Sequence, residues 1–182
     1  VRCRDILTQL SRQPDQEAAG PFKSMPFSAM VEAAAAPHQR DEIVVIVEQH
    51  GPDGAFDLAA EEGAIAADQP RVVLTPEVNQ GIGTLVQNAV QFARETVEVY
   101  WDEDTASVII EDDGPGFAAL VLDRLGEPYV SSRAGKDGHM GLGIFIAKTL
   151  LERGGASLSF SNRSEGGARV TVQWRRADLE TA

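Results

Sequence analysis

An acidic, glycine-bearing segment directly follows an apolar run and limits how the chain can fold around it. Val108-Ile109-Ile110 has the composition of a buried strand, and the sequence continues as Glu111-Asp112-Asp113-Gly114-Pro115-Gly116-Phe117. This order places a carboxylate at a strand end and lets two glycines fold the backbone closely around a bound base. Asp and Gly also mark ordinary turns, so the motif alone leaves a plain turn open. The accompanying segments decide between the two interpretations.

Two further segments fit a nucleotide site. Residues 81–93 predict a helix, because apolar side chains recur there at helical spacing: Ile82, Leu85, Val86, Ala89, Val90 and Ala93. Asn88 falls outside this stripe. Downstream, a glycine run over 138–143 opens into a helical pattern from Ile144 to Leu151 that ends before Gly154-Gly155. A glycine loop that leads into a helix N-terminus can bind an anion, since free N–H groups and the positive end of the helix dipole converge there.

The order of the glycines excludes two other nucleotide folds. A dinucleotide-binding fold needs its glycines after the first strand of a βαβ unit, and a P-loop needs Gly-Lys-Ser/Thr. Here Gly143 is followed by Ile144, and no Gly-Lys-Ser/Thr sequence occurs.

Four motifs stand in the order of known sequence boxes called N, G1, F and G2. They are Asn88-Ala89, Asp112-x-Gly114-x-Gly116, Gly126-Glu127-Pro128-Tyr129 and Gly141-Leu142-Gly143. By these motifs, over about residues 20 to 176, the chain resembles the catalytic ATP-binding domain of sensor histidine kinases, in the GHKL superfamily with gyrase and MutL. Segments 2–7, 126–130 and 145–153 look more narrowly like RegB/PrrB-type redox-responsive sensor kinases.

The remaining pattern fits an α/β fold, a two-layer sandwich of a mixed β-sheet with helices on one face, which the resemblance identifies as the Bergerat ATP-binding fold. Ser24-Met25-Pro26 predicts the start of a helix that continues over 27–36. Strands are expected over 43–47, 71–74, 97–101, 106–111, 157–161 and 168–174, with another near 55–58. We expect residues 1–20 to be the end of a dimerisation helix and a linker, and residues 21–182 to be the catalytic ATP-binding domain.

Asp112 is the candidate adenine-binding residue. A buried carboxylate accepts a hydrogen bond from the exocyclic amine of adenine, whereas guanine presents a carbonyl oxygen there. A buried polar group left unpaired costs about 1–3 kcal/mol, so this contact predicts roughly tenfold or greater selectivity for adenine. Asp113 is the alternative, but the motif spacing selects Asp112, and we expect Asp113 to be exposed.

Taken alone, Asn88 fits an ordinary Asn on a helix surface. Together with the other boxes, the resemblance implies that Asn88 is the catalytic residue and a metal ligand, a role that its neutral amide oxygen suits because Mg2+ takes few protein ligands. One helical turn earlier stands Thr84, where ATP-hydrolysing relatives of the resembled superfamily carry a glutamate that activates water. Thr is not a general base near neutral pH, so the sequence disfavours water as the phosphate acceptor. Many histidine kinases have Asn at the position of Thr84 and a basic residue at that of Gln91, which puts two polar contacts in doubt.

The expected cofactors are ATP and Mg2+, and the resemblance assigns the nucleotide-binding residues as Asn88, Asp112, Gly114, Gly116, Arg133, Lys136, Gly141, Leu142 and Gly143. Lys148 is either a phosphate contact or a solvated surface charge. Residues 126–138 have the composition of a mobile lid that closes over phosphates. Within them, Pro128-Tyr129 either takes part in catalysis or packs back on the core.

The net charge of the chain limits which molecules it can bind. The formal net charge of −12 argues against a nucleic-acid-binding protein, which needs a basic face. It also repels a nucleotide triphosphate at long range, so a divalent cation and local basic residues have to compensate. No apolar run approaches membrane-spanning length, and residue 1 is Val rather than Met. We therefore expect a cytoplasmic piece of a longer protein, which the resemblance implies is a homodimer in the bacterial inner membrane.

The phosphate acceptor is expected elsewhere in that longer protein. Neither His38 nor His50 is followed by the Glu/Asp-x-x-x-Pro pattern that histidine kinases place after their phosphorylated histidine, and His139 lies in the expected lid. The resemblance implies transfer to a histidine of the protein's own dimerisation domain, and then to a response regulator.

Cys3 is the single cysteine, so an intramolecular disulfide is excluded. It shares an apolar helical face with Ile6, Leu7 and Leu10, which favours a small core residue. Its arginine neighbours favour the thiolate, and the resemblance makes Cys3 a candidate redox thiol.

The sequence thus predicts the catalytic domain of a two-component sensor histidine kinase, which transfers the γ-phosphate of Mg-ATP to histidine, in redox-responsive signalling. A regulatory nucleotide-binding module without phosphotransfer and a superfamily ATPase are the alternatives.

Overall fold

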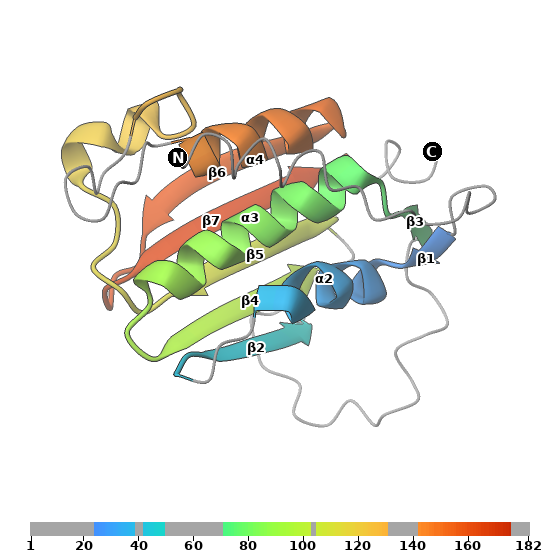
Figure 1. The fold of residues 1–182 in the computed structure, drawn as a ribbon, viewed down its shortest axis with the longest axis horizontal. Helices are drawn as coiled ribbons and strands as arrows, with labels where there is room; N and C mark the ends of the chain where they lie inside the picture. Colours follow the sequence, from blue (N-terminus) through green and yellow to red (C-terminus); the bar gives the residue numbers. More distant parts are fainter. Residues whose placement is uncertain (1–23, 39–41, 50–70, 103–104, 131–141, 176–182) are drawn as a thin grey trace, which may run out of the picture.

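The protein folds into two layers, a five-stranded sheet and a layer of helices that covers one of its faces (Figure 1). The computed structural model describes residues 24–38, 42–49, 71–102, 105–130 and 142–175. The predicted α/β sandwich with helices on one face is therefore confirmed. The predicted dimerisation-helix end and the strand near 55–58 lie outside the described residues.

The main sheet has the spatial order β2-β4-β5-β7-β6. Its strands are β2 (Val44–Gln49), β4 (Thr96–Asp102), β5 (Ser107–Asp112), β6 (Ala156–Asn162) and β7 (Ala168–Trp174). β2 runs parallel to β4, and the other neighbours are antiparallel. This gives the mixed sheet that the sequence predicts.

A separate two-stranded sheet forms from β1 (Ser24–Pro26) and β3 (Arg71–Val73), which pair antiparallel. The sequence prediction for 71–74 as a strand is thus correct, but 24–26 are a strand rather than the first turn of a helix. Pro26 explains the change, because its fixed φ of −57° suits both extended backbone and the position before a helix. The helix itself, α2, covers Phe27–Ala35, and the short η1 (Ala36–His38) follows it.

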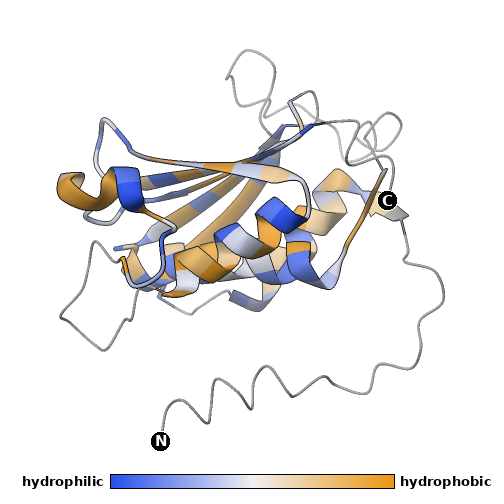
Figure 2. Cartoon of the chain, turned by 90° about the horizontal axis from the view of Figure 1, so that it is seen from above, coloured by the Kyte–Doolittle hydropathy of each residue, from blue (hydrophilic) through white to orange (hydrophobic). Residues whose placement is uncertain are grey.

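The core lies between the sheet and the helices. Side chains alternate along each strand, so one face of the sheet is apolar, and Figure 2 shows hydrophilic and hydrophobic residues alternating along the strands. In β4, Val97, Val99 and Trp101 are buried in the core. Phe27 packs edge-on against Trp101 and Trp174 and ties α2 to the sheet.

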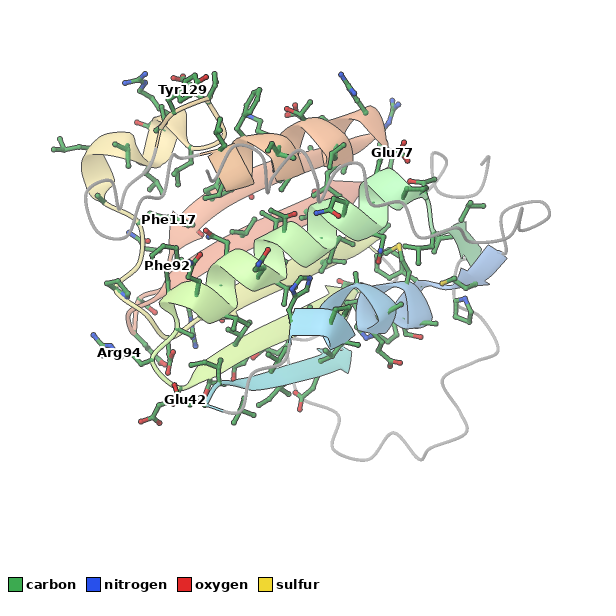
Figure 3. The ribbon with its side chains drawn as sticks, in the orientation of Figure 1. Glu42, Glu77, Phe92, Arg94, Phe117 and Tyr129 are labelled. Atoms are coloured by element: carbon green, nitrogen blue, oxygen red, sulfur yellow. The ribbon has the colours of Figure 1, made fainter. Side chains whose placement is uncertain are left out.

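Helix α3 (Pro76–Phe92) crosses the middle of the sheet, from Glu77 at one end to Phe92 at the other (Figure 3). Its start is set by sequence, since the Thr75 hydroxyl accepts a hydrogen bond from the Val78 amide at 3.2 Å and Pro76 occupies the first turn. Two further helices are η2 (Ala119–Arg124) and α4 (Leu142–Arg153). Among the described residues, no helix is both long and apolar enough to cross a membrane.

Two glycines inside α3 allow close helix packing. A Cβ on Gly81 would lie 2.6 Å from Cγ of Leu151 on α4, and a Cβ on Gly83 would lie 2.8 Å from Nε2 of His38. Glycine inside a helix costs about 0.5–1 kcal/mol relative to alanine, and here it is required by the neighbouring side chains. The α3 axis therefore lies close to α4 on one side and to η1 on the other.

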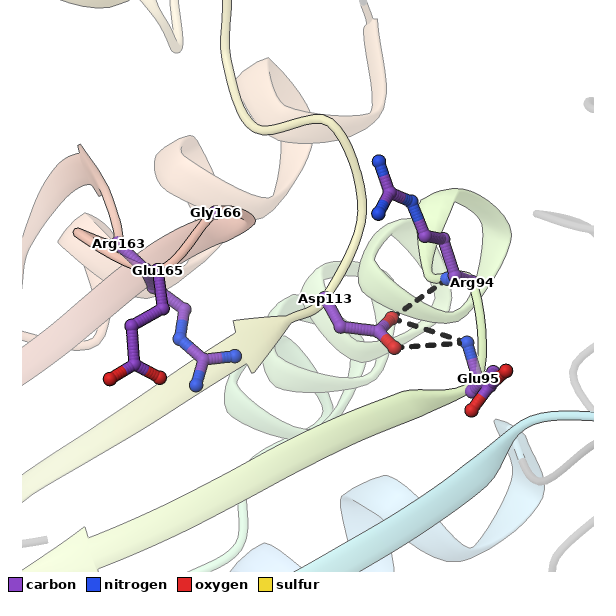
Figure 4. A pocket seen from close by; sticks show the side chains of 6 residues that line it. All are labelled: Arg94, Glu95, Asp113, Arg163, Glu165 and Gly166. Atoms are coloured by element: carbon purple, nitrogen blue, oxygen red, sulfur yellow. Dashed lines mark hydrogen bonds between the residues drawn. The ribbon is translucent and has the colours of Figure 1, made fainter.

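Asp113 holds the connection between α3 and β4. Its carboxylate oxygens accept hydrogen bonds from the backbone amides of Arg94, Glu95 and Thr96 at 2.7–3.2 Å, and Figure 4 shows those from Arg94 and Glu95. Burial raises the pKa of this carboxyl, but the amide donors outweigh burial, and its pKa lies below the ordinary 3.8. Asp113 is half-buried and its carboxylate is hydrogen-bonded, so the expectation that it is exposed is wrong.

We expect Asp113→Asn to lower the free energy of unfolding by about 1–2 kcal/mol at pH 7, as loss of a capping carboxylate does. The folded pKa is below the unfolded one, so this stabilisation is present above the unfolded pKa and is lost as the pH falls through the folded value. Urea unfolding of both proteins from pH 7 down to pH 2 measures the difference. Asp123→Asn, on exposed η2, is the charge-matched control; a difference that does not shrink below about pH 4 would contradict the assignment.

Candidate functional site

The ends of one strand and two helices lie at the same edge of the molecule. The C-terminal end of β5, the C-terminal end of α3 and the N-terminal end of α4 all lie on the left in Figure 1. Figure 3 places Phe92, the last residue of α3, near Phe117, which follows β5. The motifs that the sequence singles out around Asn88, Asp112 and Gly143 are therefore brought to the same side of the sheet.

Asp112 is the last residue of β5 and points into the helix layer, because it alternates with the core residues Val108 and Ile110. It is only 4% exposed. Its Oδ1 accepts hydrogen bonds from the amides of Gly114 at 2.8 Å and Ala168 at 3.3 Å. These donors fix the carboxylate in a buried position that suits recognition of a ligand donor.

The glycines around Asp112 are required by close backbone contacts. A Cβ on Gly114 would lie 2.3 Å from the Phe92 carbonyl oxygen, and one on Gly167 would lie 1.8 Å from the Asp112 carbonyl oxygen. Gly167 also has a φ of +103°, which side chains with a Cβ rarely adopt. The segment after β5 is thus held between the end of α3 and the β6–β7 turn.

Asn162, at the end of β6, fixes the second half of this segment. Its Oδ1 accepts from the Phe117 amide at 2.7 Å, and its Nδ2 donates to the Phe117 carbonyl at 2.8 Å. The side-chain amide satisfies both backbone groups of Phe117, as a neighbouring strand would. A Cβ on Gly116 would come within 2.8 Å of Asn162 Oδ1, so this position also requires glycine.

Asn88 stands one helical turn after Thr84, so it shares the face of α3 that lies beside the start of α4. It is half-buried, and its side chain makes no hydrogen bond to another described residue. Thr84, one turn earlier, is engaged within the helix: its hydroxyl donates to the Gln80 carbonyl at 2.7 Å and accepts from Gln80 Nε2 at 3.2 Å. Within the described part of the chain the Asn88 amide thus has no hydrogen-bond partner, whereas the Thr84 hydroxyl is bonded within its own helix.

Helix α4 begins at Leu142, two residues earlier than the apolar pattern predicts, so Leu142 and Gly143 form its first turn. The position of a Cβ on Gly143 lies 3.9 Å from the Thr84 methyl, which places this turn beside α3. The first amides of a helix lack partners within the helix and can bind an anion. The helix ends as predicted, at Arg153 before Gly154 and Gly155, and Gly155 has a φ of +80°.

The expected lid is described only as far as residue 130. Leu125 and Gly126 are buried, and the stem of Lys148 on α4 packs over Gly126, 2.5 Å from where a Cβ would lie. Tyr129 is 77% exposed, so of the two alternatives for Pro128-Tyr129, packing on the core is not what the structure has. The Lys148 ammonium lies 3.9 Å from Glu152, as a surface charge does.

Several expected site residues lie outside the described residues. They are Cys3, Arg133, Lys136 and Gly141. His50 and His139, which the sequence analysis rejects as phosphate acceptors, lie outside them as well. No group of three His, Cys, Asp or Glu side chains in the described part of the chain gathers into a metal cluster. Asn88, in this part of the chain, carries a neutral amide oxygen of the kind that Mg2+ accepts as a ligand.

His38 is directed away from the site. Its ring packs on Gly83, and Gly83 and Asn88 are five residues apart on α3, about 140° around the helix. Burial lowers the pKa of His38 below its ordinary 6.5, which favours the neutral ring.

The sequence predictions include the β6–β7 turn as a link between two strands but miss its contacts with the site. Asn162, Gly167 and Ala168 all contact the Asp112 segment, although they lie 45 or more residues further along the chain. The only local signal is the Gly166-Gly167 pair, which reads as an ordinary hairpin turn.

Known proteins resemble this chain in sequence and in fold. Residues 75–178 match the family described as histidine kinase-, DNA gyrase B- and HSP90-like ATPase. The sensor histidine kinase RegB of Cereibacter sphaeroides is 38% identical over 175 residues, which cover 90% of this chain and 35% of that protein. The chain thus spans about a third of the length of this curated relative.

Solved structures agree in fold. The mycobacterial sensor histidine kinase MprB superimposes with a TM-score of 0.64 at 15% identity, covering 84% of this chain and 97% of that one. The catalytic domain of the histidine kinase ThkA gives a TM-score of 0.62 at 16% identity, covering 86% and 96%. With the family match over residues 75–178, these comparisons confirm the resemblance that the sequence motifs indicate: the chain belongs to the histidine kinase-, DNA gyrase B- and HSP90-like ATPase family.

Proposed function

We propose that this chain is the ATP-binding catalytic domain of a two-component sensor histidine kinase, which transfers the γ-phosphate of Mg-ATP to a histidine of the protein's own dimerisation domain. The observation that carries the proposal is the buried Asp112 carboxylate, held at the end of β5 by two backbone amides. Family membership and 38% identity to a sensor histidine kinase support it.

Asp112 supplies adenine selectivity in this proposal. Its Oδ1 already accepts from Gly114 and Ala168, and a carboxylate has further acceptor capacity for the exocyclic amine of adenine. Guanine presents a carbonyl oxygen at this position, which a carboxylate repels. Asp113 is not available for this role, since its two oxygens bind the amides that begin β4.

Asn88 and the first turn of α4 serve the phosphates. The half-buried amide of Asn88 has the neutral oxygen that suits Mg2+, which keeps most of its shell for water and phosphate oxygens. Leu142 and Gly143 offer helix N-terminal amides to a phosphate oxygen. Gly114 and Gly116 permit close backbone approach, and we propose Gly141, Arg133 and Lys136 as additional phosphate contacts.

The phosphate acceptor is a histidine rather than water. Phosphoryl transfer asks the protein mainly to position groups and to neutralise charge, so the nature of the acceptor depends on what can be activated nearby. Thr84 stands where a water-activating base would be needed, and its hydroxyl is bonded to Gln80. This favours the kinase over the superfamily ATPase.

The relatives of this chain are the basis for what we propose about the longer protein, its partners and its signal. We propose a homodimeric, membrane-anchored longer protein whose partners are its own dimerisation domain and a response regulator, and whose signal is redox state, with Cys3 as the candidate thiol. The 38% identity to RegB supports the redox assignment. A regulatory module that binds ATP without phosphotransfer is the remaining alternative, favoured by Thr84 and Gln91.

We expect calorimetric titration to show magnesium-assisted binding of ATP and ADP, and binding of GTP at least about tenfold weaker, because Asp112 pairs with adenine. Asp112→Asn should abolish this selectivity and lower ATP affinity about tenfold or more. Asp123→Asn, an exposed change of equal charge, should leave both unchanged. Equal binding of ATP by Asp112→Asn and the wild type would overturn the adenine assignment.

We expect the domain to phosphorylate the dimerisation domain of its full-length protein on histidine, measured with γ-labelled ATP as an acid-labile product. Asn88→Ala should slow transfer by roughly a hundredfold, the scale of losing one charge-stabilising group. Gln87→Ala, on an exposed part of the same helical turn, is the control. Steady phosphate release without transfer would favour the ATPase, and binding with neither activity would favour the regulatory module.

A further inference from the structure

A like-charge pair lies behind the end of β5, on the sheet face that the helices leave open. Glu98 on β4 and Glu111 on β5 are direct cross-strand neighbours, and their side chains alternate with those that enter the core. Like charges placed directly opposite each other destabilise a sheet. Glu111 is nevertheless buried, so cations have to neutralise it.

Arg163, the first residue after β6, bridges this pair. Its Nε lies 2.9 Å from Oε2 of Glu111, and its Nη2 lies 3.6 Å from Oε2 of Glu98. The side chain is 22% exposed, and Figure 4 shows its guanidinium directed from the β6–β7 turn towards the end of β5. Two carboxylates therefore fix the orientation of the guanidinium plane.

The third nitrogen of this guanidinium reaches Asp112. Nη1 of Arg163 donates to the Asp112 carbonyl oxygen at 3.3 Å. On the helix side of the same residue, the Ala168 amide donates to Oδ1 of Asp112 at 3.3 Å. The turn that carries both donors is closed by hydrogen bonds between Arg163 and residues 166 and 167. One short hairpin thus holds both the backbone and the carboxylate of Asp112.

We propose that Arg163 is a positioning residue for nucleotide selectivity: it fixes the peptide group of Asp112 from behind the sheet, so that the carboxylate is aimed at the base. This inference rests on the proposed function of Asp112. Selectivity between adenine and guanine depends on the direction of one carboxylate, and small displacements of a positioned group have large effects on recognition. Arg is required because its fork serves three acceptors at once, whereas the Lys ammonium is a single charged point.

Arg169 provides a matched control on the same face. It lies on β7, directly across from Glu111, and its side chain pairs with the other oxygen of that carboxylate. It has no side-chain hydrogen bond to Asp112 in the described part of the chain. Removing either arginine leaves Glu111 with one cation fewer, but only the loss of Arg163 also removes a hydrogen-bond donor to the Asp112 carbonyl oxygen.

The test compares Arg163→Gln, Arg163→Lys and Arg169→Gln by titration with ATP and GTP in the presence of magnesium, well below the melting temperature of each variant. We expect Arg163→Gln to reduce the ATP-to-GTP affinity ratio about tenfold, and Arg163→Lys to reduce it as well while recovering much of the melting temperature. Arg169→Gln should lower the melting temperature and leave the ratio unchanged.

Hydrogen exchange of the Ala168 amide in the nucleotide-free protein gives a second readout. This amide donates to Asp112 Oδ1, so we expect faster exchange in both Arg163 variants than in Arg169→Gln. If Arg163→Gln does not fold, Arg163→Lys decides the question by the same two measurements.

The outcomes separate this inference from the proposed function. An affinity ratio that stays at the wild-type value in the Arg163 variants, or that falls equally in Arg169→Gln, would show that Arg163 only supports the fold. If Asp112→Asn abolishes selectivity in the same experiment, the proposed function stands while the role of Arg163 is rejected. If Asp112→Asn also binds like the wild type, the proposed function itself fails.

Discussion

The site depends on the burial of one carboxylate at the end of a strand. A buried charged group needs hydrogen-bond donors, since leaving it unsatisfied costs more than most single interactions contribute. Asp112 obtains amide donors from Gly114 and from Ala168, and the approach of these backbones is possible only because positions 114 and 167 lack a Cβ. The glycines of this region are thus a consequence of satisfying the carboxylate, and the proposed nucleotide site uses the geometry that results.

Helix α3 connects the end of β5 to the rest of the fold, because each of its faces packs against a different element. Its apolar face packs on the sheet, while Gly81 and Gly83 admit α4 and η1 on either side. Asn88 is left on the face towards α4, one turn before Phe92, whose carbonyl lies against Gly114. Because the same helix packs the core, contacts the glycine loop and carries Asn88, the position of the amide relative to Asp112 is determined by core packing.

Whether a feature could be predicted from the sequence depends on how far apart along the chain its interacting residues lie. The strand before Asp112, the α3 stripe and the Gly154-Gly155 helix end are local patterns, and they were predicted correctly. Arg163 and Ala168 act on Asp112 over separations of 51 and 56 residues, and no local pattern marks them. Asp113 was misjudged for the same reason, because the amides it binds lie 17 to 19 residues away. The pairing of β1 with β3 likewise follows from tertiary contact rather than propensity.

Charge supports the proposed role of a divalent ion at this site. The chain carries a formal net charge of −12, which opposes the approach of a nucleotide triphosphate. Near the site, Arg163 is committed to Glu98 and Glu111, and Lys148 lies beside Glu152. Cations whose charge is already balanced by carboxylates add little attraction for phosphate. The helix N-terminal amides supply only partial charge. In the proposed function, a divalent ion that accompanies the nucleotide therefore offsets most of the phosphate charge.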